Sequence, residues 1–257
     1  RPFHGRAVRA IDYELSRGCR FNCTFCMEES VKTLYDESDE EKYFRSKTVD
    51  HVIDEIKYLK ERHSLDMVKF HDQDFLDISE DYLDELAERW SCEVKLPFCV
   101  ETTLVRITDR KLKAMKKMNL WIMSIGLESG SEYIRRKILA KPTPSNDKVV
   151  ELFDMIHESG LNYHTYNLIG LPYETKEDIF ETIRLNKRAK IQSVGVGFYI
   201  PYEGTKLKEL CVEKGWLKDD NKSQYSLKEF SPLRMPQITD EELRHMMIHF
   251  HYFLHTP

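Results

Sequence analysis

The chain has 257 residues, enough for one domain with a sizeable core, and 41% of them are hydrophobic. Its formal net charge of -5 is mild and no basic run or stripe is present, which argues against a nucleic-acid partner. No apolar stretch approaches the ~20 residues that span a bilayer, and the N-terminus lacks the apolar core of a signal peptide. We therefore expect a protein of a reducing cytoplasm without membrane contacts.

One pattern recurs along the chain: a short β-branched or aromatic run, a polar turn, and a helix with an N-cap signal. The expected strands are 8–15, 67–71, 95–100, 121–127, 161–169 and 193–200. Expected helix starts are Thr48, Ser79, Thr108, Ser131, Ser145 and Thr175, with a last short helix near 206–213. Strands that alternate with helices predict a parallel sheet, and six such units are fewer than the eight of a complete barrel.

The turn after the first expected strand carries the run Cys19-Arg20-Phe21-Asn22-Cys23-Thr24-Phe25-Cys26. Iron–sulfur cubes are usually held by four cysteines and structural zinc by four ligands. A loop that offers three thiols therefore suggests a metal centre with one open coordination position. A zinc ribbon would need a second pair of ligands, and the remaining cysteines are scattered. A disulfide framework is disfavoured because such frameworks belong to short secreted domains.

Polar residues also follow the second and third strands. Asp72, Gln73 and Asp74 are acceptors that could serve an ammonium group, or they form a solvated turn that caps the next helix. We interpret the preceding His71 as a packed or hydrogen-bonded histidine rather than a catalytic base. Glu101, flanked by threonines, could bind a ribose or a substrate, or could close the ladder and cap.

The fourth strand ends in Ser124-Ile125-Gly126-Leu127-Glu128-Ser129-Gly130-Ser131-Glu132. Here a carboxylate can accept from sugar hydroxyls, while the glycines let the backbone come close to a ligand. Ser131 and Glu132 also suit a helix N-terminus, and both interpretations can hold together. The fifth strand ends in Ile169-Gly170-Leu171-Pro172, and the sixth leads to 201–205, where a plain turn is the alternative.

Together these motifs resemble the radical S-adenosylmethionine superfamily, whose signature is C-x-x-x-C-x-x-C with an aromatic residue, here Phe25, before the last cysteine. The resemblance implies an α/β fold over residues 1–218: an open partial (βα)6 TIM-like barrel with a parallel six-stranded sheet. It implies a 4Fe-4S cluster on Cys19, Cys23 and Cys26. S-Adenosylmethionine would chelate the fourth iron and be cleaved reductively to a 5′-deoxyadenosyl radical.

The resemblance also assigns candidate residues for binding S-adenosylmethionine. Asp72, Gln73 and Asp74 replace the Gly-Gly-Glu with which many relatives hold the amino group. Glu128 and Ser129 would approach the ribose and methionyl group. Lys141 aligns with a basic position that reaches the methionyl carboxylate, although a solvated surface lysine is an alternative. The complete set of cofactor-binding candidates is Phe25, Asp72, Gln73, Asp74, Glu101, Glu128, Ser129, Lys141, Ile169 and Gly170. The last two would contact adenine, and the catalytic residues are unknown.

The run from Arg1-Pro2-Phe3 to Cys19, the Glu128 motif and Pro201–Thr205 are most similar to the cobalamin-dependent subgroup. This implies cobalamin as a further cofactor, bound mainly by an N-terminal domain outside this chain. Expected partners are a small-molecule substrate, a reductant such as flavodoxin or ferredoxin, and further domains of the same protein. The reaction would be methyl transfer to an unactivated centre, a radical rearrangement, or oxidative ring contraction or ring closure. A non-catalytic iron–sulfur electron-transfer module is the alternative.

Beyond residue 218 the pattern changes. Residues 219–224 read as a polar linker, and a helix follows with Thr239-x-x-Glu242 as its capping box. We interpret 219–257 as a linker and a docking helix, the start of a further domain. Four histidines in this helix resemble a metal tract, but their neighbours are core residue types, so we assign them to structure: His245, His249, His251 and His255.

Overall fold

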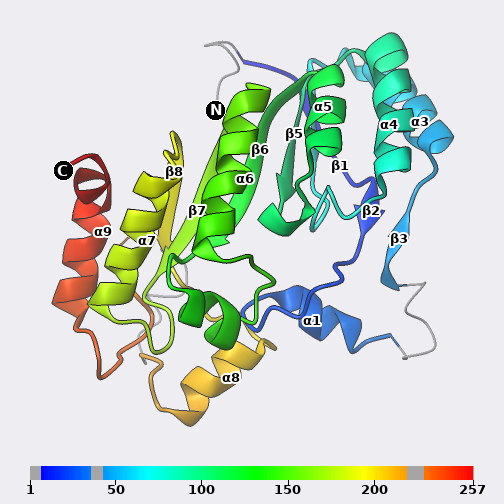
Figure 1. Cartoon of the computed structure of the whole chain (residues 1–257). Coiled ribbons are helices and arrows are strands. Elements are labelled where there is room, and N and C mark those ends of the chain that lie inside the picture. The colour runs from blue at the N-terminus through cyan, green and yellow to red at the C-terminus, as the bar shows by residue number, and fades with distance from the viewer. Residues whose placement is uncertain (1–6, 36–42, 219–228, 257) are drawn as a thin grey trace. The chain divides into compact units, whose positions relative to one another are not determined.

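The computed structural model describes residues 7–35, 43–218 and 229–256 (Figure 1). Six strands form one sheet in the order β1-β4-β5-β6-β7-β8. Their bounds are β1 Ala10–Tyr13, β4 Met67–Phe70, β5 Phe98–Thr102, β6 Leu120–Glu128, β7 Tyr163–Ile169 and β8 Val194–Phe198. Two short strands, β2 Ser16–Arg17 and β3 Arg45–Ser46, form a separate antiparallel ladder. The predicted α/β fold with a six-stranded parallel sheet, as in a partial TIM-like barrel, is confirmed.

Helices alternate with the strands as the repeated pattern predicts. They are α1 Met27–Lys32, α3 Val49–His63, α4 Glu80–Arg89, α5 Asp109–Lys117, α6 Asn146–Ser159, α7 Lys176–Arg188, α8 Lys206–Glu213 and α9 Asp240–His255. Hydroxyls at the expected caps, among them Thr48, Ser79 and Thr108, accept hydrogen bonds from first-turn amides. Thr239 and Glu242 form the predicted capping box of α9. None of the described helices is long and apolar enough to cross a bilayer.

The start of β5 differs from the prediction, which placed this strand at 95–100. A π-helix, Trp90–Val94, follows α4 directly, and Lys95 ends it with a left-handed φ of 55°. Pro97 comes next and offers no backbone N–H, so the ladder begins at Phe98. The predicted linker 219–224 lies outside the described residues.

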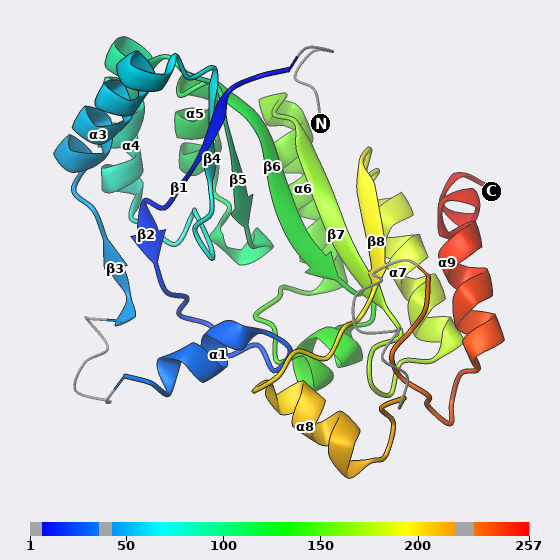
Figure 2. The ribbon, with the colours of Figure 1, turned by 180° about the vertical axis from the view of Figure 1, so that it is seen from behind.

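The chain divides into two compact units, and neither is continuous in sequence. Of the described residues, the first unit comprises 7–19, 43–125 and 154–164, and the second comprises 20–35, 126–153, 165–218 and 229–256. In the first unit α3, α4 and α5 lie together beside β1, β4 and β5 (Figures 1 and 2). Its core is an aromatic cluster of Phe70, Phe75, Trp90 and Phe98, all fully buried, with ring centroids 4.8 to 6.1 Å apart.

The other face of this sheet is polar. Along β5, Phe98, Val100 and Thr102 are buried, whereas Cys99 is half-buried and Glu101 is exposed. The parallel register pairs Cys99 with Lys69 of β4, and Glu101 with Ser124 of β6. Because side chains alternate along a strand, these groups share the face away from the aromatic cluster.

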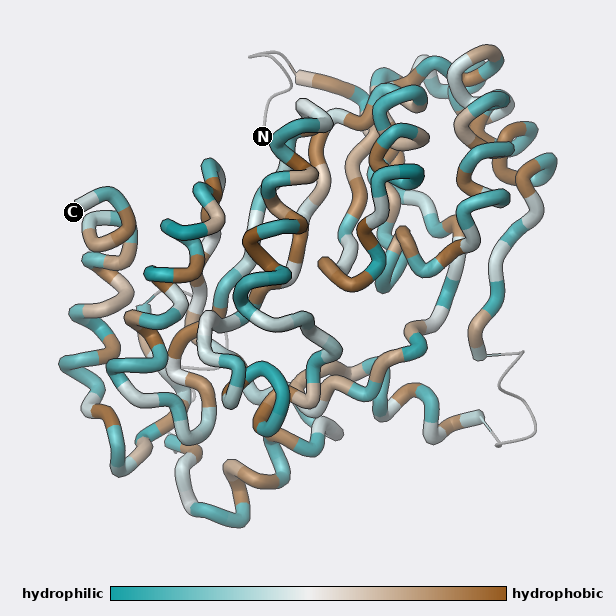
Figure 3. Tube along the Cα trace, viewed as in Figure 1, coloured by the Kyte–Doolittle hydropathy of each residue, from teal (hydrophilic) through white to brown (hydrophobic). Residues whose placement is uncertain are grey.

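In the second unit β7 pairs with β8, and α9 packs against α7. Leu243, Met246 and Phe250 of α9 are buried in the same cluster as Ile179 and Ile183 of α7. Figure 3 shows hydrophobic and hydrophilic residues interspersed along the helices, as expected where one face is buried. The helix was expected to dock against a domain outside this chain, whereas its buried face packs within the core of this unit. That a further domain starts near residue 219 stays a prediction.

Candidate functional site

The cysteine loop begins in the first unit, where two side chains hold its backbone. The N–H of Gly18 donates to Gln73 Oε1 at 3.0 Å, and the Tyr43 hydroxyl lies 3.0 Å from the N–H of Cys19, which donates to it. Gly18 has a φ of 99°, and a Cβ there would lie 2.7 Å from the carbonyl oxygen of Tyr43. Only glycine fits this close approach.

The other two cysteines of the loop belong to the second unit. The Cys26 N–H donates to the Cys23 carbonyl at 3.1 Å, which closes a tight turn just before α1. Cys19, Cys23 and Cys26 are all partly accessible thiols, and burial raises the pKa of Cys26. Within residues 7–35, 43–218 and 229–256, no three His, Cys, Asp or Glu side chains form a group that could hold a metal ion.

Asp72 is buried directly after β4. Its carboxylate accepts hydrogen bonds from the Leu15 N–H at 3.2 Å, the Ser16 N–H at 2.5 Å and the Ser16 hydroxyl at 2.6 Å. Burial raises its pKa, while these hydrogen bonds favour the ionised form. Asp72 therefore fixes the turn that leads from β1 to the cysteine loop, which favours the alternative interpretation of this carboxylate as a turn-forming group.

Asp74 has the same character. It accepts from the hydroxyls of Thr102 at 2.6 Å and Thr103 at 2.7 Å, and Arg106 lies 3.7 Å away. Its carboxylate thus connects the loop after β4 to the end of β5. By contrast, Glu101 is exposed, and no described side chain forms a hydrogen bond or ion pair with its carboxylate. Of the acidic candidates in the first unit, Glu101 is the one turned to solvent.

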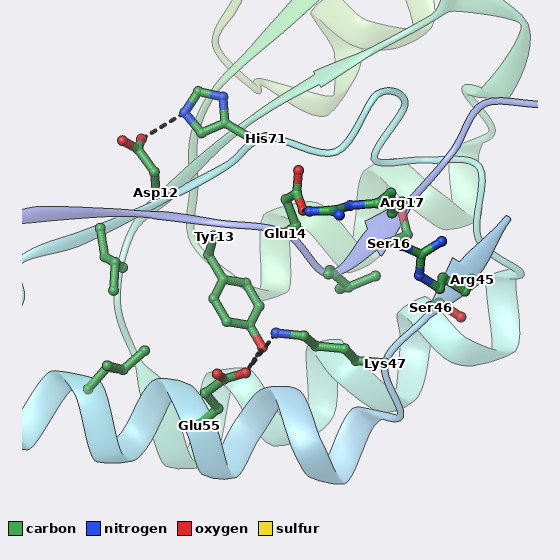
Figure 4. Close-up of a pocket in the computed structure, with 13 residues that line it drawn as sticks. Asp12, Tyr13, Glu14, Ser16, Arg17, Arg45, Ser46, Lys47, Glu55 and His71 are labelled. Atoms are coloured by element: carbon green, nitrogen blue, oxygen red, sulfur yellow. Dashed lines mark hydrogen bonds and ion pairs between the residues drawn. The ribbon is translucent and has the colours of Figure 1, made fainter. Parts of the chain in front are cut away.

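A pocket of about 940 Å³ lies in the first unit beside β1 (Figure 4). Several of its polar groups are hydrogen-bonded to one another: Glu55 accepts from both Tyr13 and Lys47 at 2.7 Å. Beyond the end of β4, His71 Nε2 lies 2.7 Å from Asp12 Oδ1. The interpretation of His71 as a hydrogen-bonded histidine is confirmed.

The end of β6 brings two predicted site residues together in the second unit. Glu128 Oε1 lies 3.1 Å from Lys141 Nζ, and both side chains are about nine-tenths buried, with 10% and 9% exposed. Gly126 makes this possible, because a Cβ at that position would collide with the Glu128 carboxylate and lie 3.0 Å from Lys141 Nζ. Lys141 Nζ is also 5.9 Å from the ring centroid of Phe25. Lys141 is therefore a buried, paired cation rather than a solvated lysine.

Glu128 adopts an unusual backbone conformation. Its φ is 65°, and the Ser129 N–H donates to the Leu127 carbonyl at 2.9 Å, which closes a three-residue γ-turn. A left-handed conformation costs a residue with a Cβ roughly 1–2 kcal/mol, so the surrounding contacts must hold it in place. Strained backbone of this kind gathers at ligand-binding sites.

Buried contacts fix the residues that follow. The Gly130 N–H donates to the Thr182 hydroxyl at 2.7 Å, and Ser129 Oγ lies 3.3 Å from the same oxygen. Arg135 donates to the Ser129 carbonyl at 2.5 Å, and burial lowers the pKa of its guanidinium to about 10. Ser129 itself is fully buried, so its hydroxyl serves this local network.

The end of β7 is organised by a residue that sequence reasoning missed. Glu174 is fully buried, and its Oε2 accepts from the Gly170 N–H at 2.6 Å and the Leu171 N–H at 3.2 Å. Its Oε1 has no hydrogen-bond partner among the described residues, and burial raises its pKa to about 8. A glutamate inside an apolar turn four residues after Gly170 was the available signal. Ile169 is fully buried, and Gly170 has a φ of 74°.

A partial barrel of parallel strands, a loop with three thiols and polar side chains at strand ends together define a class of α/β protein built to bind ligands at the carboxyl ends of its strands. The model of the radical SAM superfamily matches residues 13–185. The chain belongs to the radical SAM superfamily.

Curated relatives include enzymes of known and unknown substrate. An uncharacterized methyltransferase of Pyrococcus horikoshii is 25% identical over 90% of this chain and 48% of its own length. A cytidylyl-2-hydroxyethylphosphonate methyltransferase of Streptomyces wedmorensis is 24% identical over 82% of this chain and 39% of its own length. An anaerobic magnesium-protoporphyrin IX monomethyl ester cyclase of Cereibacter sphaeroides is 24% identical over 78% of this chain and 32% of its own length. The chain spans less than half the length of these relatives.

Solved structures share the fold. The radical S-adenosylmethionine methyltransferase TsrM of Kitasatospora setae, with cobalamin and a [4Fe-4S] cluster bound, superposes with a TM-score of 0.67 at 15% identity. That match covers 93% of this chain and 43% of TsrM. Coproporphyrinogen III oxidase (HemN) of Escherichia coli gives a TM-score of 0.63 at 12% identity over 96% of this chain and 53% of its own.

Proposed function

We propose that this chain is the core of a radical SAM enzyme in which Cys19, Cys23 and Cys26 hold a 4Fe-4S cluster. The observation that carries the proposal is the loop itself: three accessible thiols within eight residues, inside the segment that the family model matches. Thiolate is the ligand that iron–sulfur clusters take, so the donor set fits the group. Three ligands instead of four leave one iron for S-adenosylmethionine. The bound and reduced cluster would supply one electron to the sulfonium, whose S–C bond would break to give methionine and a 5′-deoxyadenosyl radical.

The buried pair at the end of β6 suits a nucleoside that carries both charges and hydroxyls. We assign Lys141 to the methionyl carboxylate and Glu128 to the ribose hydroxyls. Each now compensates the other's charge at 3.1 Å, so neither is buried uncompensated when the nucleoside is absent. Phe25, next to Lys141, would complete this wall, and Ser129 would hold the turn that presents Glu128.

The remaining candidate residues are assigned according to whether their polar groups already form hydrogen bonds within this chain. Because the carboxylates of Asp72 and Asp74 accept from the chain's own donors, we propose that these two residues shape their loops. Gln73 Oε1 accepts from the Gly18 N–H, so we propose the exposed carboxylate of Glu101 and the Gln73 amide nitrogen as the groups of these candidates that meet ligand or substrate. The Gly170 amide is committed to Glu174, so its carbonyl is the main-chain group that we propose for adenine, beside Ile169.

For the reaction outcome we propose methyl transfer to an unactivated centre, with cobalamin bound mainly by a part of the protein outside this chain. Two of the curated relatives are methyltransferases, and TsrM is described with cobalamin bound. The cyclase relative supports anaerobic ring closure as the second candidate. A small-molecule substrate and a reductant such as flavodoxin or ferredoxin complete the proposal, in a reducing cytoplasm.

The test is anaerobic reconstitution of the full-length protein with iron and sulfide, followed by reduction in the presence of S-adenosylmethionine. We expect release of 5′-deoxyadenosine, or of S-adenosylhomocysteine if a methyl group is transferred. An intact cluster that yields neither product would favour the electron-transfer module instead.

Substitution of a single cysteine in the loop tests the proposed cluster ligands. Cys23→Ala removes one of three proposed ligands, so we expect both the visible absorbance of the cluster and turnover to be lost. Cys92→Ala, at an exposed thiol outside the loop, is the matched control and should change neither. An unchanged spectrum in Cys23→Ala would exclude this residue as a ligand.

A further inference from the structure

The segment that carries Lys141 follows the end of a short π-helix, Ile134–Ile138. A helix end leaves its last carbonyls without intrahelical partners. Leu139 closes this helix by donating its N–H to the Ile134 carbonyl at 2.9 Å. Ala140 then turns left-handed, with a φ of 46°, and Lys141 follows with its N–H on the Arg135 carbonyl at 2.9 Å. The position of Lys141 is thus set by how this helix end is held.

The cysteine loop holds that helix end, through Thr24. Its hydroxyl donates to the Ile138 carbonyl at 2.6 Å, and its N–H donates to the Leu139 carbonyl at 3.0 Å. Both carbonyls are among those that the helix end would leave unsatisfied. The Thr24 carbonyl in turn accepts from the Leu207 N–H at 2.9 Å, at the start of α8. Thr24 therefore bonds the loop to two other segments of the second unit.

These contacts matter because Thr24 lies between two cysteines of the loop and its partner Leu139 lies close to Lys141. Thr24 lies directly after Cys23 and two residues before Cys26, and its partner Leu139 lies two residues before Lys141. Two hydrogen bonds of Thr24 and a few peptide units therefore connect Cys23 to Lys141. The left-handed Ala140 is strained, so this stretch keeps its shape only while both ends are fixed.

We propose that Thr24 is a positioning residue: its hydroxyl caps the π-helix and sets Lys141 in register with the cysteine loop, so that Lys141 Nζ meets the carboxylate of S-adenosylmethionine. This deepens the proposed function and rests on it. Thr24 touches neither cluster nor nucleoside in this assignment and acts through Lys141. Without the hydroxyl, the hydrogen bond from the Thr24 N–H to the Leu139 carbonyl remains. The loop therefore stays attached to the helix end, but the position of Lys141 relative to the loop is held less firmly.

The experiment compares Thr24→Val with Thr24→Ser in the full-length reconstituted protein. Valine keeps the shape of the threonine side chain and removes its hydroxyl, whereas serine keeps the hydroxyl. We expect both variants to carry wild-type iron and sulfide. The dissociation constant of S-adenosylmethionine, read from its effect on the electron paramagnetic resonance of the reduced cluster, should rise about fivefold to tenfold in the valine variant. The serine variant should bind as the wild type does. Thr33→Val, whose hydroxyl donates to the Ser30 carbonyl at the end of α1, is the matched control and should be neutral.

A double-mutant cycle decides whether Thr24 acts through Lys141. In a Lys141→Met background, Thr24→Val should weaken nucleoside binding by less than about twofold, because the cation it positions is gone. Equal effects in both backgrounds would overturn the proposal, as would wild-type affinity in Thr24→Val. Loss of the cluster in Thr24→Val would also overturn it, since the bond we invoke places Lys141 and not the thiolates. Failure of the wild-type protein to bind S-adenosylmethionine would instead overturn the proposed function.

Discussion

Glu128 shows how one residue combines strain with burial. Its φ of 65° is a conformation that residues with a Cβ seldom adopt, and its carboxylate is buried against Lys141. Neither condition would persist alone, because a buried carboxylate without a partner is costly and a strained turn without contacts relaxes. Gly126 completes the arrangement by leaving the space that the carboxylate fills.

The ionisation of Glu174 is tied to folding. Its pKa of about 8 in the folded chain lies above the ordinary value of 4.5, because burial disfavours the carboxylate. The stabilising contribution of the protonated form is therefore complete below pH 4.5 and is lost as pH rises toward 8.

We predict that Glu174→Gln flattens the decline in unfolding free energy between about pH 5 and 8, a slope of up to about 1.4 kcal/mol per pH unit for one proton. Glutamine keeps an acceptor for the Gly170 and Leu171 amides but cannot ionise. Denaturant unfolding at several pH values measures the slope, and Glu101→Gln at an exposed carboxylate is the control. Identical slopes in wild type and Glu174→Gln would contradict the role of burial.

At this scale sequence reasoning identified groups but not their pairing. Glu128 and Lys141 were both proposed for a nucleoside, yet their ion pair depends on a γ-turn that no local signal announces. Asp72 was proposed as an acceptor for an ammonium group. Its actual donors lie 56 and 57 residues away, at Ser16 and Leu15, and such contacts come only from the tertiary fold.

Among the elements, α9 is a helix whose amphipathic pattern has a direct structural outcome. Its buried side chains join the core that α7 and the end of β7 share. We predict that Phe250→Ala, at a fully buried ring, lowers the free energy of unfolding by about 3–5 kcal/mol.

Tyr252→Ala provides the matched control on the same helix, because that ring is 64% exposed and should cost less than about 0.5 kcal/mol. Denaturant midpoints measure both. If the two truncations cost the same, α9 does not pack in the core of the second unit.

Elements were predictable where their signals are local. Caps such as Thr48 and the box of Thr239 with Glu242 need only a few neighbouring residues, and they are confirmed. The start of β5 was wrong by three residues, since the apolar run from Lys95 gave no sign of the π-helix that occupies the segment before it. Antiparallel pairing of Ser16 and Arg17 with β3 was not anticipated, because such short strands lack a periodic pattern.

At the scale of the whole molecule, β1 is an edge strand of the sheet that the described strands form. Ala10 and Asp12 of this strand are exposed. A charged side chain on an outer strand discourages pairing with another chain.

We predict that Asp12→Val causes concentration-dependent self-association, because it turns β1 into a continuous apolar run. Light scattering during size-exclusion chromatography measures the effect. Asp12→Glu keeps the charge on the same strand, and it should remain monodisperse to the same degree as the wild type. A monodisperse Asp12→Val protein would show that this charge does not guard the strand.

The space beside Gly126 also bears on the comparison of related sequences. With any larger residue at this place, the Glu128 carboxylate and Lys141 Nζ would have to shift, because an added Cβ would overlap the first and lie 3.0 Å from the second. The residue at this position therefore separates related sequences that leave this space open from those whose two charged side chains must be arranged differently.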